Sequence, residues 1–405
     1  MGLNIELMTK LNNTYLNIIG LICLAYFPLT LSVPKASHLV LLVLIFASIW
    51  LVLNRKNWSF SKEDFLFTSS FVLYFIVISS ITFYHGGEVR EIDFVSRFLL
   101  IIPIYFFVKN SDFSKNWIFA GIGIAAIVFG LNWMLPSTFF DWTSIKGMQT
   151  FFSGLFSLLS LLQIKKTNKS WINLFFLMAF ILGFISMIYS GGRGVWIAYI
   201  LTFSSLVFFR FNFRVIKKFI LLTFLVCSLL IAYSIPSTGV KQRVDISIEN
   251  IHKYIENRGI EWRAVDSLIA RFEMYKASYF IVEKDYLLGV GKNNYKQKVK
   301  DLVDDKKIHG IISIFNHPHN EFVSAIVFYG LPGLFVLLLI FGMALIYSFK
   351  DNRSDKALSN SLFALTVYYI FYAANNAVFA HQKSIILFVF LVSLLTGLIN
   401  RAKKI

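Results

Sequence analysis

The chain has 405 residues, of which 57% are hydrophobic and 15% are charged, and its formal net charge at pH 7 is +17. This composition is too apolar for a soluble globular domain and predicts an all-α polytopic membrane protein. Positively charged loops that face anionic lipid headgroups account for the excess of Lys and Arg, so the net charge does not indicate a nucleic-acid partner.

Apolar segments predict about twelve transmembrane helices, because a span needs about 20 mainly apolar residues. The fourth and sixth segments are shorter than the others, and the fourth carries Arg97 near its start. The predicted spans are 14–33, 38–54, 65–84, 94–108, 117–135, 150–164, 171–189, 194–209, 219–235, 322–348, 360–379 and 384–399. The expected division is therefore nine spans in residues 1–235, one large loop domain at 236–321, and three spans with a cytoplasmic tail at 322–405.

The distribution of Lys and Arg predicts the orientation of the spans, because positive charge in short loops stays on the cytoplasmic side. With the N-terminus inside, the inner segments hold nineteen of the 39 Lys and Arg residues, and the short outer loops hold six. Both termini are then expected in the cytoplasm, and the large helical loop is expected on the outer face.

The segment SGGRGVW, residues 190–196, joins the seventh and eighth spans with almost no loop. Arg193 is therefore expected at the outer edge of the membrane, between Gly191, Gly192 and Gly194. Glycines let the backbone approach a ligand closely, and a guanidinium group matches phosphate oxygens in a bidentate fork. The alternative is an arginine that only extends its side chain toward the membrane interface.

The large loop contains LIARFEMY, residues 268–275, at the start of a predicted helix. Leu268, Phe272, Tyr275 and Tyr279 recur at helical spacing and predict one apolar stripe. Arg271 is expected on the flank of this stripe, where it borders whatever the stripe packs against.

Further along the loop, LLGVGKNNY, residues 287–295, places Gly289 and Gly291 after an apolar run. This pattern predicts a tight turn with close backbone packing. It is not a dinucleotide-binding fingerprint, because the third glycine and the strand before it are missing.

The segment HPHNEF, residues 317–322, stands directly before the tenth span. Pro318 favours an extended His317, and Asn320 or His319 can cap a helix that begins around Glu321. These side chains are thus expected at a helix N-terminus on the outer face, where anions are favoured. A histidine there could act as a general base on a hydroxyl group.

Two other interpretations of this segment remain open. His317 and His319 could be metal ligands together with Glu321 or His309, although the chain has no second ligand cluster of recognised spacing. The histidines and Asn320 could also serve only to cap the helix.

The many spans, SGGRGVW, the loop with LIARFEMY and LLGVGKNNY, and HPHNEFVSAIVFYGLPG together resemble the O-antigen ligase and polymerase superfamily. The motifs cover roughly residues 170–340, and HPHNEF followed by Gly330 and Gly333 is their most specific part. The resemblance implies a fold of the lipid-dependent glycosyltransferase type in the bacterial inner membrane. It also implies a periplasmic active site that transfers a glycan from undecaprenyl diphosphate to an acceptor sugar, inverting and independent of a metal or cofactor.

By the same resemblance, His319 matches the catalytic histidine of the family. Arg193 matches its arginine at the membrane turn, and Arg271 matches its loop arginine. These two are expected to hold the diphosphate and neutralise it as it leaves. Supporting roles are expected for His317, Asn320, Glu321, Gly191 and Gly192, with Asn320 a candidate for orienting the imidazole.

Chain length, the number of spans and the position of the large loop favour a ligase of lipopolysaccharide biosynthesis, with the lipid A-core oligosaccharide as acceptor. A surface-polysaccharide polymerase with the same donor is the first alternative. A carrier that moves polyprenyl-linked glycans without chemistry is the second, although carriers usually place their polar residues near the bilayer midplane.

The loop at 85–97, HGGEVREIDFVSR, could touch the acceptor, but its spacing is not specific. Asn375 and Asn376 are expected within the eleventh span, as hydrogen-bond partners between helices.

Overall fold

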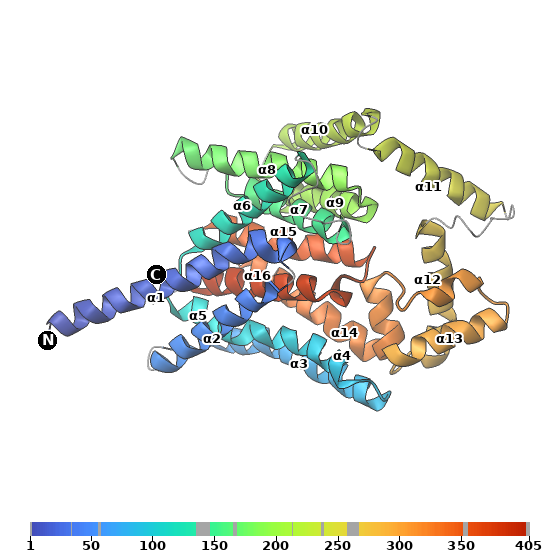
Figure 1. Ribbon diagram of the computed structural model, residues 1–405, viewed down its shortest axis with the longest axis horizontal. Coiled ribbons are helices and arrows are strands. Elements are labelled where there is room, and N and C mark those ends of the chain that lie inside the picture. Colours follow the sequence, from blue (N-terminus) through green and yellow to red (C-terminus); the bar gives the residue numbers. More distant parts are fainter. Residues whose placement is uncertain are drawn as a thin grey trace.

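A computed structural model describes residues 2–33, 35–55, 58–134, 146–164, 168–212, 214–235, 239–256, 267–350 and 355–401. Within these ranges the chain is helical and contains no strand (Figure 1). The expected all-α class is therefore confirmed for the described part of the chain.

The part of the chain before the large loop consists of helices that pack side by side (Figure 1). Helix α6 packs against α1 and α8, while α7 packs against α8 and α9. The helices are α1 (Gly2–Ser32), α2 (Ser37–Leu53), α3 (Lys62–Tyr84), α4 (Val89–Ser96), the 3-10 helix η2 (Arg97–Leu100), α5 (Ile101–Asn110), α6 (Lys115–Met134), α7 (Lys146–Leu161), α8 (Ser170–Ser190), α9 (Arg193–Phe209) and α10 (Val215–Ser234).

The large loop and the closing part of the chain complete the fold. Helix α12 packs against α14, and α15 packs against both α9 and α14. The elements are α11 (Val240–Ile255), α12 (Ser267–Asp285), α13 (Lys292–Asp304), η6 (Gly310–Ile314), α14 (Glu321–Phe349), α15 (Lys356–Ala373), η7 (Val378–Ala380) and α16 (Gln382–Arg401).

Every predicted span overlaps a helix, but length and composition support membrane crossing for only part of the set. Six helices of the described chain are long and apolar enough: Asn12–Ser32, Lys62–Tyr84, Lys115–Asn132, Ser170–Ser190, Glu321–Phe349 and Gln382–Arg401. Shorter apolar helices are Ser37–Leu53, Gly147–Leu161 and Arg193–Phe209. These helices make the chain a polytopic membrane protein, while the count of twelve spans remains a prediction.

Two predicted spans differ from the observed helices. The fourth, 94–108, is interrupted, because its residues belong in turn to α4, η2 and α5. The eleventh, 360–379, ends too late, because α15 stops at Ala373 and the chain turns before η7. The apolar stretch in the sequence continues through this turn, because Ala377, Val378 and Phe379 are apolar and buried although they lie outside α15. Hydropathy therefore does not mark the end of the helix.

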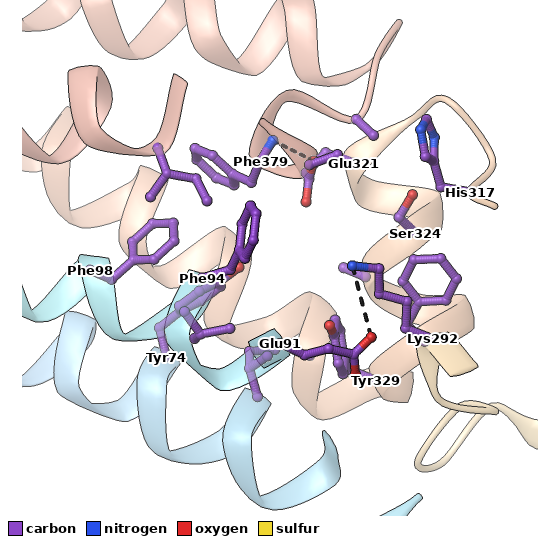
Figure 2. A pocket seen from close by; sticks show the side chains of 18 residues that line it. Tyr74, Glu91, Phe94, Phe98, Lys292, His317, Glu321, Ser324, Tyr329 and Phe379 are labelled. Atoms are coloured by element: carbon purple, nitrogen blue, oxygen red, sulfur yellow. Dashed lines mark hydrogen bonds and ion pairs between the residues drawn. The ribbon is translucent and has the colours of Figure 1, made fainter. Parts of the chain in front are cut away.

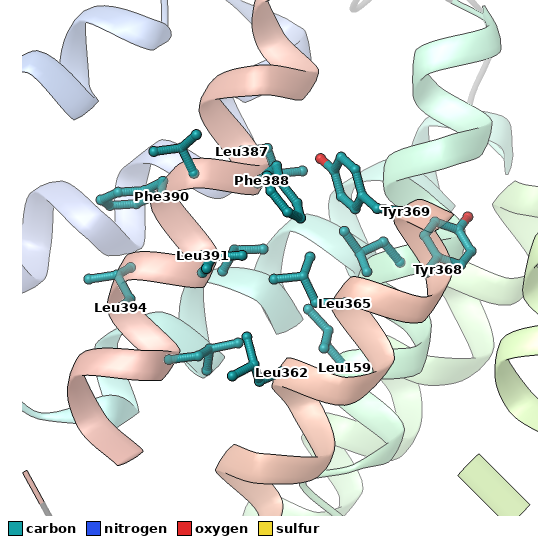
Figure 3. Close-up of a cluster of buried hydrophobic side chains, with 14 of the residues drawn as sticks. Leu159, Leu362, Leu365, Tyr368, Tyr369, Leu387, Phe388, Phe390, Leu391 and Leu394 are labelled. Atoms are coloured by element: carbon teal, nitrogen blue, oxygen red, sulfur yellow. The ribbon is translucent and has the colours of Figure 1, made fainter. Parts of the chain in front are cut away.

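Helix α16 forms the centre of the membrane part (Figures 1 and 3). Residues are buried over 89% of its most apolar 18-residue window, as expected for a helix that is apolar on all sides. Tyr369 of α15 lies beside Phe388 of α16, with ring centroids 4.8 Å apart, and Leu365 and Leu362 continue this contact along α15 (Figure 3). The packing of α15 on α16 fixes the position of the turn that follows α15.

A buried polar network also ties α3, α5 and α16 together. The Lys109 ammonium group forms an ion pair with Asp64, and the Tyr105 hydroxyl donates to the same carboxylate. Asn400 Nδ2 donates to the Tyr105 hydroxyl at 2.6 Å. Asp64 also completes a capping box with Ser61 at the start of α3. Buried charges of this kind depend on each other, because removing one leaves the other unpaired.

The loop helices α12 and α13 share a small core with the start of α14. The buried face of α12 contains Ala270, Met274, Ala277 and Ile281, which is not the predicted stripe. Of that stripe, Phe272 is 39% exposed and Tyr279 is 63% exposed, and the side chain of Leu268 lies outside the described ones. Small residues on the neighbouring face let α12 approach its partners more closely than the aromatic rings would.

The turn after α12 docks on a break in α14. Helix α14 is non-helical at Gly330, which has φ of 64°, and Pro332 two residues later has no N–H. The carbonyl groups of Val327 and Phe328 accept instead from Val290 N–H at 2.8 Å and from Gly291 N–H at 3.0 Å.

A Cβ atom on Gly330 would lie 2.2 Å from the Leu287 carbonyl oxygen, so this contact requires glycine. The tight turn predicted around Gly289 and Gly291 is confirmed, since both residues have positive φ and pack closely on neighbouring backbone or side chains. The docked turn fixes the start of α13 against the membrane part.

Candidate functional site

The turn between α8 and α9 holds Arg193 as the first residue of α9. Gly191 ends α8 with φ of 77° and ψ of 24°, a left-handed conformation that favours glycine. Gly192 follows in extended conformation, and a Cβ atom on it would lie 3.0 Å from Cγ2 of Thr150. The Arg193 guanidinium group donates from Nη1 to Oγ of Ser247 in α11.

Arg193 and Arg271 come together although they are far apart in the sequence. Both line a mainly apolar cavity of about 540 Å³ between α8, α9, α10 and α11, and both also line an adjoining polar cavity of about 230 Å³. Asn375 belongs to both walls. The polar cavity is lined by Gly147, Gly191, Gly192, Arg193, Gly194, Val195, Arg271, Tyr372, Asn375 and Asn376.

This pair of cavities has the character of a site for an amphipathic anion. Ile197, Ile200 and Leu230 are among the apolar residues that line the large cavity, while both arginines stand where it meets the polar one. Guanidinium groups remain protonated and can donate to several anionic oxygens at once. The arrangement therefore suits a ligand with an anionic head and a long apolar tail.

The HPHNEF segment forms the start of α14 as predicted. Oδ1 of Asn320 accepts from the N–H groups of Phe322 at 3.0 Å and Val323 at 3.1 Å, and Glu321 is the first residue of the helix. Nδ2 of Asn320 donates to the Ala374 carbonyl oxygen at 2.9 Å. Asn320 thus connects α14 to the end of α15, and these bonds engage both its side-chain oxygen and its side-chain nitrogen.

The residue that meets the imidazole of His319 is Asn376, in the turn after α15. Its Oδ1 lies 3.4 Å from Nδ1 of His319. The same oxygen accepts from Ala377 N–H at 3.0 Å, which identifies this atom as the oxygen of the amide. Nδ1 of His319 must then carry the proton in this contact, and Nε2 keeps its lone pair.

The backbone and the neighbouring histidine also hold His319. Its φ of 53° is left-handed, which is uncommon for a residue with a Cβ atom. Its N–H donates to Nδ1 of His317 at 3.2 Å, and the two ring centroids are 4.2 Å apart. A strained conformation that several contacts maintain is typical of functional sites.

Burial keeps both imidazoles neutral near pH 7. For His319, burial lowers the pKa below its ordinary value, the contact with Asn376 opposes this shift, and the charges of Arg271 and His381 lower the pKa further. For His317, burial lowers the pKa to about 4, with smaller contributions from His319, His381 and Lys292. A neutral imidazole can accept a proton, so His319 has the protonation state of a general base.

A second pocket lies beside His317 and Glu321 (Figure 2). Glu321 Oε2 accepts from Phe379 N–H at 2.9 Å. Lys292 Nζ lies 3.9 Å from Oε1 of Glu91 across the pocket. His319 touches a wall residue of the polar cavity, Asn376, as well as His317 in the wall of this pocket, so the histidine pair links the two spaces.

The predicted site residues thus fall into two groups. Arg193, Arg271, Gly191 and Gly192 line the polar cavity, while His317 and Glu321 line the second pocket. His319 lies between these groups through its contacts. Across the described ranges, no three or more His, Cys, Asp or Glu side chains gather in a way that could hold a metal ion.

Sequence reasoning missed the place of Asn375 and Asn376. Both lie in the turn after α15 and line the polar cavity, and Asn376 also donates from Nδ2 to the Tyr372 hydroxyl at 2.7 Å. Their signal was a pair of amides in an otherwise apolar stretch, which indicated hydrogen bonding but not the end of the helix.

Known proteins resemble this chain in the region that builds the site. A family model described as O-antigen ligase matches residues 178–338, which contain Arg193, Arg271 and His319. A protein of Haemophilus influenzae, described only as an uncharacterized protein, is 26% identical over 384 residues, which are 90% of this chain and 94% of that protein. The family match confirms the resemblance found in the sequence: residues 178–338 are similar to the O-antigen ligase family.

Proposed function

We propose that the protein is a lipopolysaccharide O-antigen ligase of the bacterial inner membrane. It transfers a glycan from undecaprenyl diphosphate to a sugar hydroxyl of the lipid A-core oligosaccharide, with inversion and without a metal. The observation that carries the proposal is that Arg193 and Arg271 share one polar cavity with an apolar cavity directly beside it.

The donor fits the two adjoining cavities by its chemistry. Its diphosphate needs cations, and the first isoprene units of its lipid need an apolar wall in contact with the membrane. No divalent cation is needed to hold the diphosphate if two guanidinium groups surround it.

The reaction is a single displacement at the anomeric carbon of the donor. The acceptor hydroxyl oxygen forms the new glycosidic bond while the bond from the anomeric carbon to the diphosphate oxygen breaks. The hydroxyl proton passes to Nε2 of His319, and the bonding electrons leave with the diphosphate. Arg193 and Arg271 stabilise the negative charge that develops on the leaving oxygen. Attack opposite the leaving group inverts the anomeric configuration.

Asn376 acts here as the residue that orients the base. Its contact with Nδ1 of His319 keeps the proton on that nitrogen and leaves Nε2 available. This tautomer is the one that a general base requires.

The orientation in the membrane is part of the same proposal. Residues 1–235 and 322–405 carry the transmembrane helices, residues 236–321 form the periplasmic loop domain, and both termini lie in the cytoplasm. Support comes from the fold, since α1 begins and α16 ends on the side away from α12 and α13 (Figure 1).

A deletion strain tests the proposal and separates its alternatives. Loss of a ligase leaves bare lipid A-core and accumulates lipid-linked polymer, whereas loss of a polymerase leaves core that carries one repeat unit. Purified protein supplied with donor and acceptor should form the linked product. A protein that moves the donor across vesicles without forming product would be a carrier and would contradict the proposal.

A further inference from the structure

The charged side chains and the histidine that line the second pocket come from three segments, and the reaction above uses none of these side chains. Glu91 lies on α4, Lys292 begins α13, and His317 and Glu321 belong to HPHNEF (Figure 2). The position of Lys292 relative to α14 is fixed, because the turn before Lys292 is hydrogen-bonded to the break in α14. The pocket is thus held in shape by the fold.

The size of the pocket limits what it can hold. Its volume is about 130 Å³, against about 540 Å³ for the apolar cavity beside the arginines. A prenyl chain needs the larger space. The smaller pocket suits one sugar unit at the end of a glycan, held partly inside and partly in solvent.

The chemistry of the walls suits sugar hydroxyl groups. Carboxylates accept hydrogen bonds from hydroxyls, and an ammonium group donates to them. Lys292 and Glu91 are 3.9 Å apart, near the limit of an ion pair, so each keeps capacity for a ligand. Phe94 and Tyr329 contribute aromatic walls (Figure 2), and Figure 2 shows Glu321 reaching into the pocket from the side of Phe379.

We propose that this pocket is the acceptor subsite, in which Glu91, Lys292 and Glu321 bind the hydroxyl groups of the acceptor sugar. The inference rests on the proposed function. The histidine pair borders the place where the two substrates meet: the donor lies on the side of Asn376 and the arginines, and the acceptor lies on the side of His317. An acceptor hydroxyl at the inner end of the pocket is thereby presented to the imidazoles.

A purely structural role makes a different prediction. If Glu91 and Lys292 only join the outer loop to α13, their neutralisation changes thermal stability and leaves the binding of both substrates unaltered. The Lys292 side chain is 48% exposed, so its substitution should be tolerated by the fold. Acceptor affinity therefore distinguishes the two roles.

The test uses the full chain in lipid nanodiscs, with rough lipopolysaccharide, which carries lipid A-core without O-antigen, as the acceptor probe. Binding of the probe and the KM for acceptor and donor are measured for Glu91→Gln and Lys292→Gln. We expect acceptor affinity to fall roughly ten- to hundredfold, the effect of losing one hydrogen bond to a charged group. The KM for the donor should stay at its wild-type value.

Matched controls are available on the same elements. Lys298 lies on α13, is 47% exposed and pairs with Asp285 at 3.5 Å. Asp93 lies on α4 and pairs with Arg97. Lys298→Gln and Asp93→Asn should leave both KM values unchanged.

The possible outcomes separate this inference from the proposed function. Transfer that proceeds while the pocket variants behave like the controls overturns the subsite and leaves the ligase proposal standing. Wild-type protein that binds the probe, loses binding in both pocket variants and transfers no glycan supports the subsite and contradicts the ligase proposal. A raised donor KM with unchanged acceptor binding, or no binding of the probe by wild type, overturns the subsite.

Discussion

Replacing Arg193 with lysine should reduce transfer even though the charge is kept. Two unit charges about 4 Å apart interact by about 4 kcal/mol at an effective dielectric constant of about 20, which suits a partly buried cavity. Only the part of this attraction that is gained between the bound substrate and the transition state, as charge develops on the diphosphate, lowers the activation free energy. If this part is about 2 to 3 kcal/mol, Arg193→Ala lowers kcat/KM roughly hundredfold. Arg193→Lys keeps a point charge but loses the fork, so a loss of about tenfold is expected.

The assay is transfer of glycan from a lipid-linked donor to rough lipopolysaccharide by purified protein, with folding checked by thermal denaturation. Arg210 provides the control, since it ends the same helix α9 and donates from Nε to Asn360 Oδ1 at 2.8 Å, away from the two cavities. Arg210→Lys should transfer at close to the wild-type rate. If Arg193→Lys also does so, Arg193 merely reaches toward the interface and the reasoning is refuted.

Three further predictions concern the base, its titration and the stability of the fold. His319→Ala should lose transfer by at least about hundredfold while donor binding is largely kept, and full activity would remove the base assignment. Because burial lowers the pKa of His319, the base form is present above that pKa, and kcat/KM should fall only as the pH drops through a value below the ordinary 6.5. Arg271→Gln removes a charge that lowers this pKa, so the acid limb should move to higher pH, and a limb that stays in place would argue against their coupling. Lys109→Met leaves the Asp64 carboxylate buried and unpaired, so the protein should lose about 3 to 5 kcal/mol of stability and show a lower Tm in detergent. The double variant with Asp64→Asn should regain much of this loss, and an unchanged Tm in the single variant would contradict the network.

Hydropathy predicted where helices lie because apolar length is a local property of the sequence. It placed the end of α15 too late, because Ala377, Val378 and Phe379 are buried in a turn and a 3-10 helix outside α15. That error hid the role of Asn376, since an amide inside a span and an amide at the end of a helix have the same local pattern. The contact with His319 depends on the turn geometry, which hydropathy does not report.

Periodicity alone also chose the wrong face of α12. The aromatic residues Phe272 and Tyr279 carry the strongest apolar signal, but Ala270 and Ala277 form part of the buried face. Packing favours small residues where helices approach closely, and the sequence does not state which partner a helix will meet. The side on which Arg271 lies was therefore settled only by the tertiary structure.

The local roles of single site residues could be predicted from the sequence, but the way in which distant segments come together to form the site could not. Gly191 and Asn320 have local roles, a left-handed turn and a helix cap, that follow from their residue types. The common cavity of Arg193 and Arg271 is formed by segments distant in sequence, so only the family resemblance suggested it. The pocket with Glu91 and Lys292 had no specific sequence signal, because α4 and the start of α13 are far apart in the sequence and become one wall only in the folded chain.

The most direct test of the central claim is a structure of the protein in nanodiscs with undecaprenyl diphosphate bound, determined by electron cryomicroscopy. The proposed mechanism predicts both guanidinium groups, of Arg193 and of Arg271, within hydrogen-bond distance of the phosphate oxygens. It also predicts the isoprene chain in the apolar cavity and Nε2 of His319 facing the vacant sugar position. A diphosphate bound elsewhere, or held by only one of the two arginines, would contradict the mechanism.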